Sequence, residues 1–466
     1  MNDTQRNKSQ PKRHHRQPAT TSDASPAKAE KPGLQCRQAA AKILAAVIDR
    51  KTPLDGMLDN DSGNPAYRAL SDADRALVRA ILNTALRHMP RIEVILGSLV
   101  QTPLPEGARA LHHVLVAAAT QILYLDIPDH SAVDLAVEQA QTDPRNRRFA
   151  SLVNAVLRRL AREKTELLAT TQSQPVIPAW FHARLTEVYG PVHAQAISEA
   201  QLEPPAIDLT VKSDAEQWAE RLGGWVLPTG SVRLASFSGS VAALEGFDEG
   251  AWWVQDAAAS IPARLFGDLR GKSVVDLCAA PGGKTAQLAL AGAAVTALDQ
   301  SASRLRRLQS NMDRLGFQVR TLESNLLDFK PGEGFDGVLL DAPCSSTGTI
   351  RRHPDVLWTK GPEDIAKLAA LQEKLLRHAI GLARPGGRIV FSNCSLDPSE
   401  GEEVVARVLS DRSDVVLEPI DPARWPGLED AISPEGAFRA TPAMLPAAEG
   451  RPGGLDGFYA VVLRRI

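Results

Sequence analysis

The stretch that decides the fold is residues 273–285, SVVDLCAAPGGKT. An apolar, β-branched run breaks at Pro281-Gly282-Gly283 and passes into AQLALA, so the stretch predicts a strand, a tight turn and a helix start. Glycines let the backbone approach a ligand closely, and free N–H groups at a helix start favour a polar or anionic group. The stretch therefore predicts a ligand-binding turn, against the plain alternative of a structural strand-to-helix connection.

An acidic residue, Asp299, ends the next apolar run, AAVTALD. In a doubly wound sheet, an acid about 20 residues past a glycine-rich first turn binds ribose hydroxyls. The turn has neither the G-x-G-x-x-G pattern of dinucleotide sites nor the G-x-x-x-x-G-K-[ST] pattern of phosphate loops. A nucleoside without a pyrophosphate, such as S-adenosylmethionine, fits these residues better than a dinucleotide or ATP.

The C-terminal half alternates strand-like and helix-like runs, which is typical of a doubly wound α/β sheet. Ligands of such sheets bind outside the carboxyl ends of the strands. Reactive groups follow the ends of separate predicted strands: Asp299, Asp341, Cys344 and Cys394. We therefore expect these groups to converge on one edge of the sheet.

Cys344 and Cys394 follow strands that should be neighbours, beside the predicted methyl-donor site. A lone cysteine at a strand end is usually inert packing. A thiolate that adds to carbon 6 of cytosine, however, makes carbon 5 nucleophilic toward a sulfonium methyl group. An acid near N3 assists that addition, and a base then removes the carbon 5 proton. One cysteine nucleophile, one Asp and a second thiol match these needs.

Four motifs carry a resemblance to a known family: DLCAAPGGKT, LLDAPCSSTGTIRRHPDVLW, FSNCSLDPSEGEE and GGLDGFYA. They resemble the motifs of the RsmB/Nop (Sun) family of RNA cytosine-C5 methyltransferases. The combination of Ala-Pro-Cys with Asn-Cys-Ser makes the resemblance specific. It implies S-adenosylmethionine as cofactor, small-subunit ribosomal RNA as substrate, and chemistry without a metal.

The resemblance also implies roles for individual residues. Cys394 would be the nucleophile, Cys344 would assist product release, and Asp341 would lie against donor and target cytosine. Asp299 would bind the donor's ribose, and Asn325 would lie near its adenine. The donor's methionine part would contact the turn residues Cys278, Ala279, Ala280, Pro281, Gly282, Gly283 and Lys284.

Two positions depart from the family pattern. Asn325 stands where Asp is common, and Asn393 replaces the Thr usual before the nucleophile. Neither change removes a reactive thiol or acid, so we expect activity. The segment Arg351-Arg352-His353 follows the Pro-Cys loop. It is interpreted either as a phosphate-binding segment for RNA or as a set of structural hydrogen-bond partners of that loop.

The N-terminal part, residues 34–164, has a helical period that predicts an all-α bundle. The stretches ALSDADRALVRAIL and RFASLVNAVLRRL resemble the antitermination-factor (NusB-like) domain, which implies RNA binding or docking. The last predicted helix is basic, with Arg145, Arg147, Arg148, Arg158, Arg159, Arg162 and Lys164. This cluster suits a phosphate backbone or is an ordinary charged surface.

The sequence thus predicts a multidomain protein. An all-α NusB-like bundle (residues 33–168) precedes a small α/β linker domain (175–255), which the resemblance would place on the RNA-binding surface. An α/β Rossmann-like class I methyltransferase domain (256–466) follows. Residues 1–32 lack aromatic and large branched apolar side chains, so we expect a disordered basic tail there.

Composition restricts the function further. Lys and Arg (53) nearly balance Asp and Glu (55), so any RNA surface must be local. No apolar run reaches about 18 residues, and no hydrophobic signal core begins the chain, so we expect a cytoplasmic protein without a membrane span. The four cysteines show no zinc-site spacing, so no metal is expected. A monomer is expected.

Three other functions were weighed against RNA methylation. A non-catalytic, antitermination-like RNA-binding factor would need only the helical part. A DNA cytosine-C5 methyltransferase would use the thiol of Pro343-Cys344 as its nucleophile, whereas the second thiol and the helical part favour RNA. A small-molecule methyltransferase would not need the long segment ahead of its catalytic domain.

Overall fold

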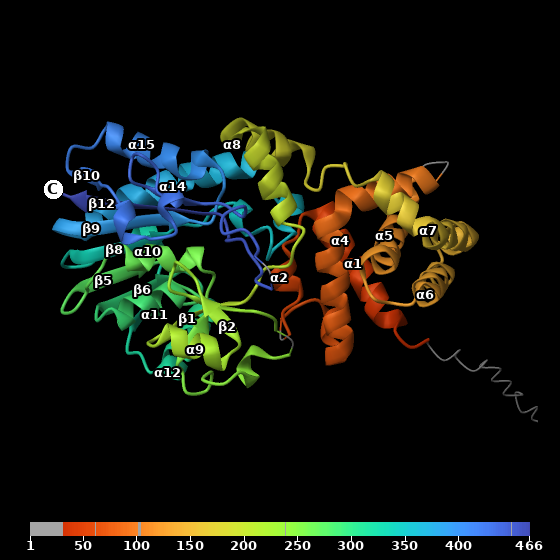
Figure 1. Cartoon of the computed structure of the whole chain (residues 1–466), viewed down its shortest axis with the longest axis horizontal. Helices are drawn as coiled ribbons and strands as arrows, with labels where there is room; N and C mark the ends of the chain where they lie inside the picture. The colour runs from red at the N-terminus through yellow and green to blue at the C-terminus, as the bar shows by residue number, and fades with distance from the viewer. Residues whose placement is uncertain (1–30, 61, 101–103, 238, 449) are drawn as a thin grey trace, which may run out of the picture.

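The computed structural model describes residues 31–60, 62–100, 104–237, 239–448 and 450–466. The predicted tail, residues 1–32, lies almost entirely outside them. A helical bundle occupies one end of the long axis of the molecule and a large mixed sheet the other (Figure 1). This arrangement confirms the predicted fold class.

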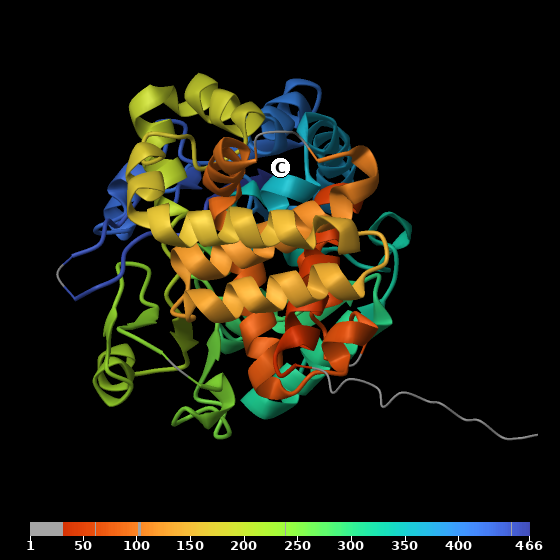
Figure 2. The same ribbon diagram turned by 90° about the vertical axis from the view of Figure 1, so that its right-hand side faces the viewer.

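The bundle is built from amphipathic helices, with no strand among its described residues. Apolar side chains at helical spacing, such as Ile43, Leu44 and Val47, are fully buried in its core. Figure 2 shows α6 and α7 side by side across its outer face. The helices are α1 (Leu34–Arg50), α2 (Leu54–Met57), α3 (Pro65–Arg68), α4 (Asp72–Leu99), α5 (Arg109–Tyr124), α6 (Asp129–Thr142) and α7 (Ala150–Thr170).

A kinked helix, α8 (Ala179–Ala200), leads to a small antiparallel sheet of order β2-β3-β1-β4. Its elements are β1 (Asp208–Val211), α9 (Ala215–Arg221), β2 (Gly224–Val226), β3 (Val232–Leu234) and β4 (Trp252–Val254). Lys212 donates a hydrogen bond to the carbonyl of Leu315 in the large domain. This contact, from the residue after β1, helps to hold the small sheet against the catalytic part.

The large sheet has the strand order β10-β12-β9-β8-β5-β6-β7, with β11 paired to β12. Its strands are β5 (Ser273–Leu277), β6 (Ala294–Asp299), β7 (Arg320–Glu323), β8 (Phe335–Asp341), β9 (Ala383–Asn393), β10 (Val415–Glu418), β11 (Phe438–Ala440) and β12 (Phe458–Arg465). Strands β5 to β9 run parallel, and β10 to β12 pair antiparallel. Asp341 is in register with Ser392, so β8 and β9 end on the same edge.

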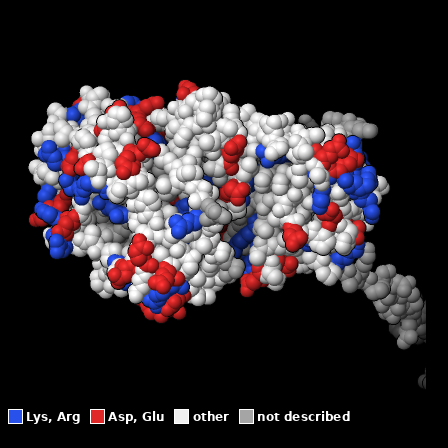
Figure 3. All heavy atoms as spheres, viewed as in Figure 1, with Lys and Arg blue, Asp and Glu red and all other residues white. Residues whose placement is uncertain are grey.

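Helices cover both faces of this sheet, with α14 and α15 on one side and α10, α11 and α12 on the other (Figure 1). Their bounds are α10 (Ile261–Arg264), α11 (Gly283–Leu290), α12 (Ala302–Leu315), α13 (Val356–Thr359), α14 (Pro362–Leu382) and α15 (Glu402–Ser410). None of the helices that the structure describes is long and apolar enough to cross a membrane. Figure 3 shows positive and negative side chains intermingled over the same face.

The bundle contacts the large domain through α13 and the residues before it. The Trp358 indole N–H donates to the carbonyl of Leu86 at 3.0 Å. The backbone N–H of Leu54 donates to the carboxylate of Asp355 at 2.9 Å. The bundle is therefore joined to the segment that follows the Pro-Cys loop.

Candidate active site

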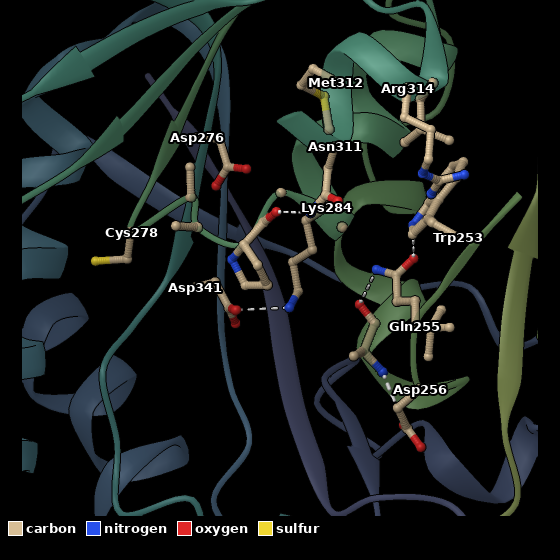
Figure 4. Close-up of a pocket in the computed structure, with 18 of the residues that line it drawn as sticks. Trp253, Gln255, Asp256, Asp276, Cys278, Lys284, Asn311, Met312, Arg314 and Asp341 are labelled. Atoms are coloured by element: carbon tan, nitrogen blue, oxygen red, sulfur yellow. Dashed lines mark hydrogen bonds and ion pairs between the residues drawn. The ribbon is translucent and has the colours of Figure 1, made fainter. Parts of the chain in front are cut away.

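A cavity of about 430 Å³ lies where the carboxyl ends of β5 and β8 face β4 of the small sheet (Figure 4). One wall is the predicted turn, residues 278–284, together with Asp276 and Asp341. The opposite wall comes from β4, its following residue and α12: Trp253, Gln255, Asn311, Met312 and Arg314. The structure thus brings the turn residues and Asp341 together. The sequence analysis did not predict the wall formed by β4, although two adjacent tryptophans in WWVQD could have indicated a binding surface.

The turn has the tight backbone that its glycines suggested. Gly282 has a φ of 105°, and a Cβ at this position would lie 3.0 Å from Cγ of Leu308 and 3.2 Å from Cε of Met312. Both the backbone angle and the space therefore favour glycine. Cys278 also has a positive φ, of 64°, and the chain turns at this residue, directly after β5.

Lys284 and Asp341 form an ion pair in the cavity, with Nζ 2.7 Å from the carboxylate (Figure 4). Burial alone would lower the pKa of Lys284, but the Asp341 carboxylate raises it above its usual value, so the ammonium stays charged. Ser392 donates to the other Asp341 oxygen at 2.9 Å. Asp341 is therefore held as an oriented carboxylate at the sheet edge.

Asp276 is a site residue that the sequence reasoning missed. It lies buried in β5, where Thr285 donates to one of its oxygens at 2.6 Å. Its Oδ1 has no hydrogen-bond partner within the described part of the chain. Burial raises the pKa of Asp276 to about 7, with Asp341 adding to the effect. An acidic residue inside the otherwise apolar run SVVDL could have identified Asp276 as a site residue.

Asp299 and Asn325 stand outside the lining of this cavity. Asp299 is 2% exposed and accepts hydrogen bonds from the backbone N–H groups of Ala280 and Ser301. Arg304 pairs with it at 3.2 Å. The Asn325 side chain accepts from the N–H of Leu327, which caps a short 3-10 turn. Asp299 thus lies directly behind the turn, and Asn325 follows the next strand, β7.

The two thiols that follow β8 and β9 are in contact, with 3.5 Å between the Sγ atoms of Cys344 and Cys394. A hydrogen bond from the Cys344 thiol lowers the pKa of Cys394, and the charge of Lys284 acts in the same direction. The same hydrogen bond raises the pKa of Cys344 well above its usual value. Cys394 is therefore the more acidic of the two thiols.

Cys278, by contrast, does not share this arrangement. Burial, together with the nearby carboxylates of Asp341 and Asp276, raises the pKa of its thiol to about 12. The Cys278 thiol stays protonated at neutral pH and acts as a wall of the cavity. Among the described residues, no group of His, Cys, Asp and Glu is arranged to hold a metal ion.

The segment Arg351-Arg352-His353 fits the structural interpretation rather than phosphate binding. Arg351 is 4% exposed and donates to the carbonyl of Gly453. Arg352 forms ion pairs with two buried carboxylates, Asp256 at 2.7 Å and Asp456 at 2.9 Å. His353 pairs with Asp55 of the bundle at 3.4 Å. Arg351 and Arg352 are therefore occupied by partners inside the molecule, and the partly exposed His353 joins the large domain to the bundle.

Comparisons with known proteins agree with this geometry. The model of the 16S rRNA methyltransferase RsmB/F family matches residues 268–464, and the NusB family model matches residues 34–162. The ribosomal RNA small subunit methyltransferase B of Vibrio vulnificus (strain YJ016) is 34% identical over 92% of this chain and 99% of its own length. That of Cronobacter sakazakii (strain ATCC BAA-894) is 33% identical over 88% and 99%.

Solved structures show the same fold. The crystal structure of PH0851 superposes with a TM-score of 0.70 over 94% of this chain and 99% of that one, at 21% identity. NSun6 from Pyrococcus horikoshii, solved with SFG, superposes with a TM-score of 0.52 over 62% and 98%, at 19% identity. The catalytic fold and the helical bundle thus occur together in known proteins.

Proposed function

The chain belongs to the 16S rRNA methyltransferase RsmB/F family, and we propose that it methylates carbon 5 of a cytosine in small-subunit ribosomal RNA. S-adenosylmethionine is the methyl donor of this enzyme class. The observation that carries the proposal is the contact between the Cys344 and Cys394 thiols, placed beside the Lys284–Asp341 pair. Two thiols of unequal acidity are what a covalent route to carbon 5 requires.

Cys394 attacks carbon 6 of the target cytosine. Its lowered pKa supplies thiolate, and the hydrogen bond from Cys344 stabilises that thiolate before attack. Asp341 is placed near N3 of the base, and it assists the addition by passing a proton from the Lys284 ammonium, which donates to its carboxylate, to N3. Addition at carbon 6 moves electron density to carbon 5, which then accepts the methyl group.

Cys344 assists release of the methylated base. The hydrogen bond to Cys394 is the largest cause of the raised pKa of Cys344. Once the Cys394 sulfur is bonded to carbon 6, this hydrogen bond no longer raises the pKa of Cys344. The Cys344 thiol first gives its own proton to solvent water, and the resulting thiolate then takes the proton from carbon 5. The carbon 6–sulfur bond then breaks, and Cys394 leaves as thiolate.

The cavity beside these thiols fits S-adenosylmethionine. The donor supplies an electrophilic sulfonium methyl group when it is bound. The backbone of residues 278–284 lies close enough to contact its methionine part, and the unpaired Oδ1 of Asp276 offers an acceptor to its ammonium group. Asp299 is assigned to its ribose and Asn325 to the neighbourhood of its adenine, because Asp299 ends β6, the strand next to β5, and Asn325 follows β7, the strand beyond it.

The basic cluster on the bundle is assigned to RNA phosphates. Arg158, Arg159 and Arg162 of α7 are exposed on the outer face of the bundle, as are Arg145, Arg147 and Arg148 before it. Clustered cations at a surface attract a phosphate backbone. Both thiols, the acid and the lysine come from one chain, so we assign a monomer that acts in the cytoplasm, where its ribosomal RNA substrate lies.

Bisulfite sequencing of small-subunit ribosomal RNA tests this function. Cells that lack the gene should lose 5-methylcytosine at a specific position. Wild-type protein should restore it, and the Cys394→Ala variant should not. If no cytosine in this RNA changes between the two strains, the proposed substrate is wrong.

A further inference from the structure

Glu400 has a fully buried side chain between the two loops that carry the thiols. It ends a short 3-10 turn, Pro398–Glu400, just before α15. One carboxylate oxygen accepts from the backbone N–H of Ser345 at 2.8 Å and from the amide of Gln372 at 3.0 Å. The other oxygen accepts from the hydroxyls of Ser345 and Ser395.

These partners flank both thiols in the chain. Ser345 directly follows Cys344, and Ser395 directly follows Cys394. Asn393, which directly precedes Cys394, donates its amide to the Glu400 carbonyl at 2.6 Å and accepts from the N–H of Ser395 at 3.0 Å. One residue therefore contacts the loops of β8 and β9 at the positions next to each sulfur.

Gln372 and Thr347 complete the network from two further elements. Gln372 of α14 donates to the carbonyl of Pro343, the residue before Cys344, at 3.0 Å. The hydroxyl of Thr347 lies 3.3 Å from that of Ser345 and 3.2 Å from that of Ser395. The loops thus have several polar links, and the Glu400 carboxylate is the group that joins them.

Every hydrogen-bond partner of the Glu400 carboxylate is an N–H or O–H group that donates to it. Burial raises the pKa of Glu400 above its usual value, although the hydrogen bonds from Ser345 and Ser395 act in the opposite direction. Its negative charge also contributes to the raised pKa of the Cys344 thiol. An apolar side chain at position 400 would leave the Ser345 N–H and two hydroxyls without this acceptor, which is costly in a buried site.

We propose that Glu400 is a positioning residue that clamps the Cys344 and Cys394 loops together and thereby sets the contact distance between their two sulfur atoms. The inference about turnover rests on the roles proposed above for the two thiols. The clamp itself does not depend on those roles, because the distance between the two sulfur atoms can be tested without any methylation. A small displacement of reacting groups lowers a rate strongly, on the order of 100-fold for about 1 Å.

The first measurement is steady-state kinetics of Glu400→Ala, Glu400→Gln and the matched control Glu403→Ala. Glu403 lies two residues into α15 with a 55% exposed side chain, so its loss removes a charge without touching the clamp. We expect Glu400→Ala to lower kcat on the order of 100-fold with unchanged KM for donor and RNA. Glu400→Gln should retain more activity, because its amide can donate to the two serine hydroxyls.

The second measurement does not depend on methylation. A trivalent arsenical such as phenylarsine oxide binds two adjacent thiols together, with loss of water. Wild-type protein and Glu403→Ala should bind it tightly, and Cys344→Ala should not. Glu400→Ala should lose this bidentate binding while iodoacetamide still alkylates Cys394 and circular dichroism shows an intact fold.

The two measurements together separate the clamp from the proposed methylation. Retained arsenical binding and retained kcat in Glu400→Ala would overturn the clamp. Arsenical binding that depends on Glu400 in a protein that methylates no cytosine would keep the clamp and overturn the proposed function. If Glu400→Ala does not fold, Ser395→Ala, which removes one bond of the clamp, carries the test, and unchanged arsenical affinity there counts against it.

Discussion

Arg87 of α4 donates a 2.6 Å hydrogen bond to the backbone carbonyl of Arg351, which lies 264 residues further along the chain. The same guanidinium donates to the carbonyl of Gln201 at 2.8 Å, and its side chain is 7% exposed. Arg351 in turn follows the loop that carries Cys344. The bundle is therefore packed against the segment that follows the Cys344 loop, so the RNA-binding role proposed for it is best tested by surface substitutions rather than by deletion.

Replacing Arg87 with methionine should destabilise the protein by about 3 kcal/mol, because it leaves two buried carbonyls without their charged donor. Thermal unfolding measures the effect. Arg68→Met is the control, since Arg68 is an exposed arginine of the same bundle. An unchanged midpoint for Arg87→Met would show that the hydrogen bonds across the interface contribute little.

The two thiols should give opposite results when each is removed. Cys394→Ala has no route to activate carbon 5 and should neither methylate RNA nor form an adduct. Cys344→Ala keeps the nucleophile but lacks the group that frees the product, so it should accumulate a covalent protein–RNA species.

A denaturing gel separates the alternatives for the thiols. An adduct with Cys394→Ala instead would assign the nucleophile to Cys344, as in DNA cytosine-C5 methyltransferases. Two active variants that form no adduct would mean that both thiols serve packing alone.

Donor binding should depend on pH through Asp276. Its pKa is raised to about 7 by burial, so it is largely neutral at pH 6 and ionised at pH 8. The positive charges of S-adenosylmethionine favour the ionised form, so the donor should bind more tightly as the pH rises through 7 and should release a proton on binding. Titration calorimetry in buffers of different ionisation enthalpy measures both effects.

Asp276→Asn provides the control for this pH dependence. It cannot titrate, so its donor affinity should be flat between pH 6 and 8. A wild-type affinity that is equally flat would remove Asp276 from the donor site.

Charge reversal on α7 should weaken RNA binding. Arg158→Glu and Arg162→Glu should each raise KM for RNA and lower the slope of log affinity against log salt by about one unit. Arg424→Glu, an exposed arginine of the catalytic part, is the control. If all three variants behave alike, α7 is an ordinary charged surface, and the bundle serves stability or a protein partner.

Much of the fold could be predicted because its patterns are local. The run SVVDL followed by APGG predicts β5 and the start of α11, and the strand-like and helix-like runs after it predict a doubly wound sheet. The sequence could not decide between phosphate binding and structural hydrogen bonding for Arg351 and Arg352. The carboxylates that pair with Arg352, Asp256 and Asp456, are about 100 residues away in the chain.

The sequence by itself determined which reactive groups meet. Asp341 ends β8, and Cys394 directly follows β9, and parallel strands bring their carboxyl ends to one edge of a sheet. The acidity of these groups depends on tertiary contacts instead. The lowered pKa of Cys394 comes from its contact with Cys344, fifty residues away in the chain, and the raised pKa of Asp276 comes from burial. Charge and desolvation act through space, so residue order alone does not carry them.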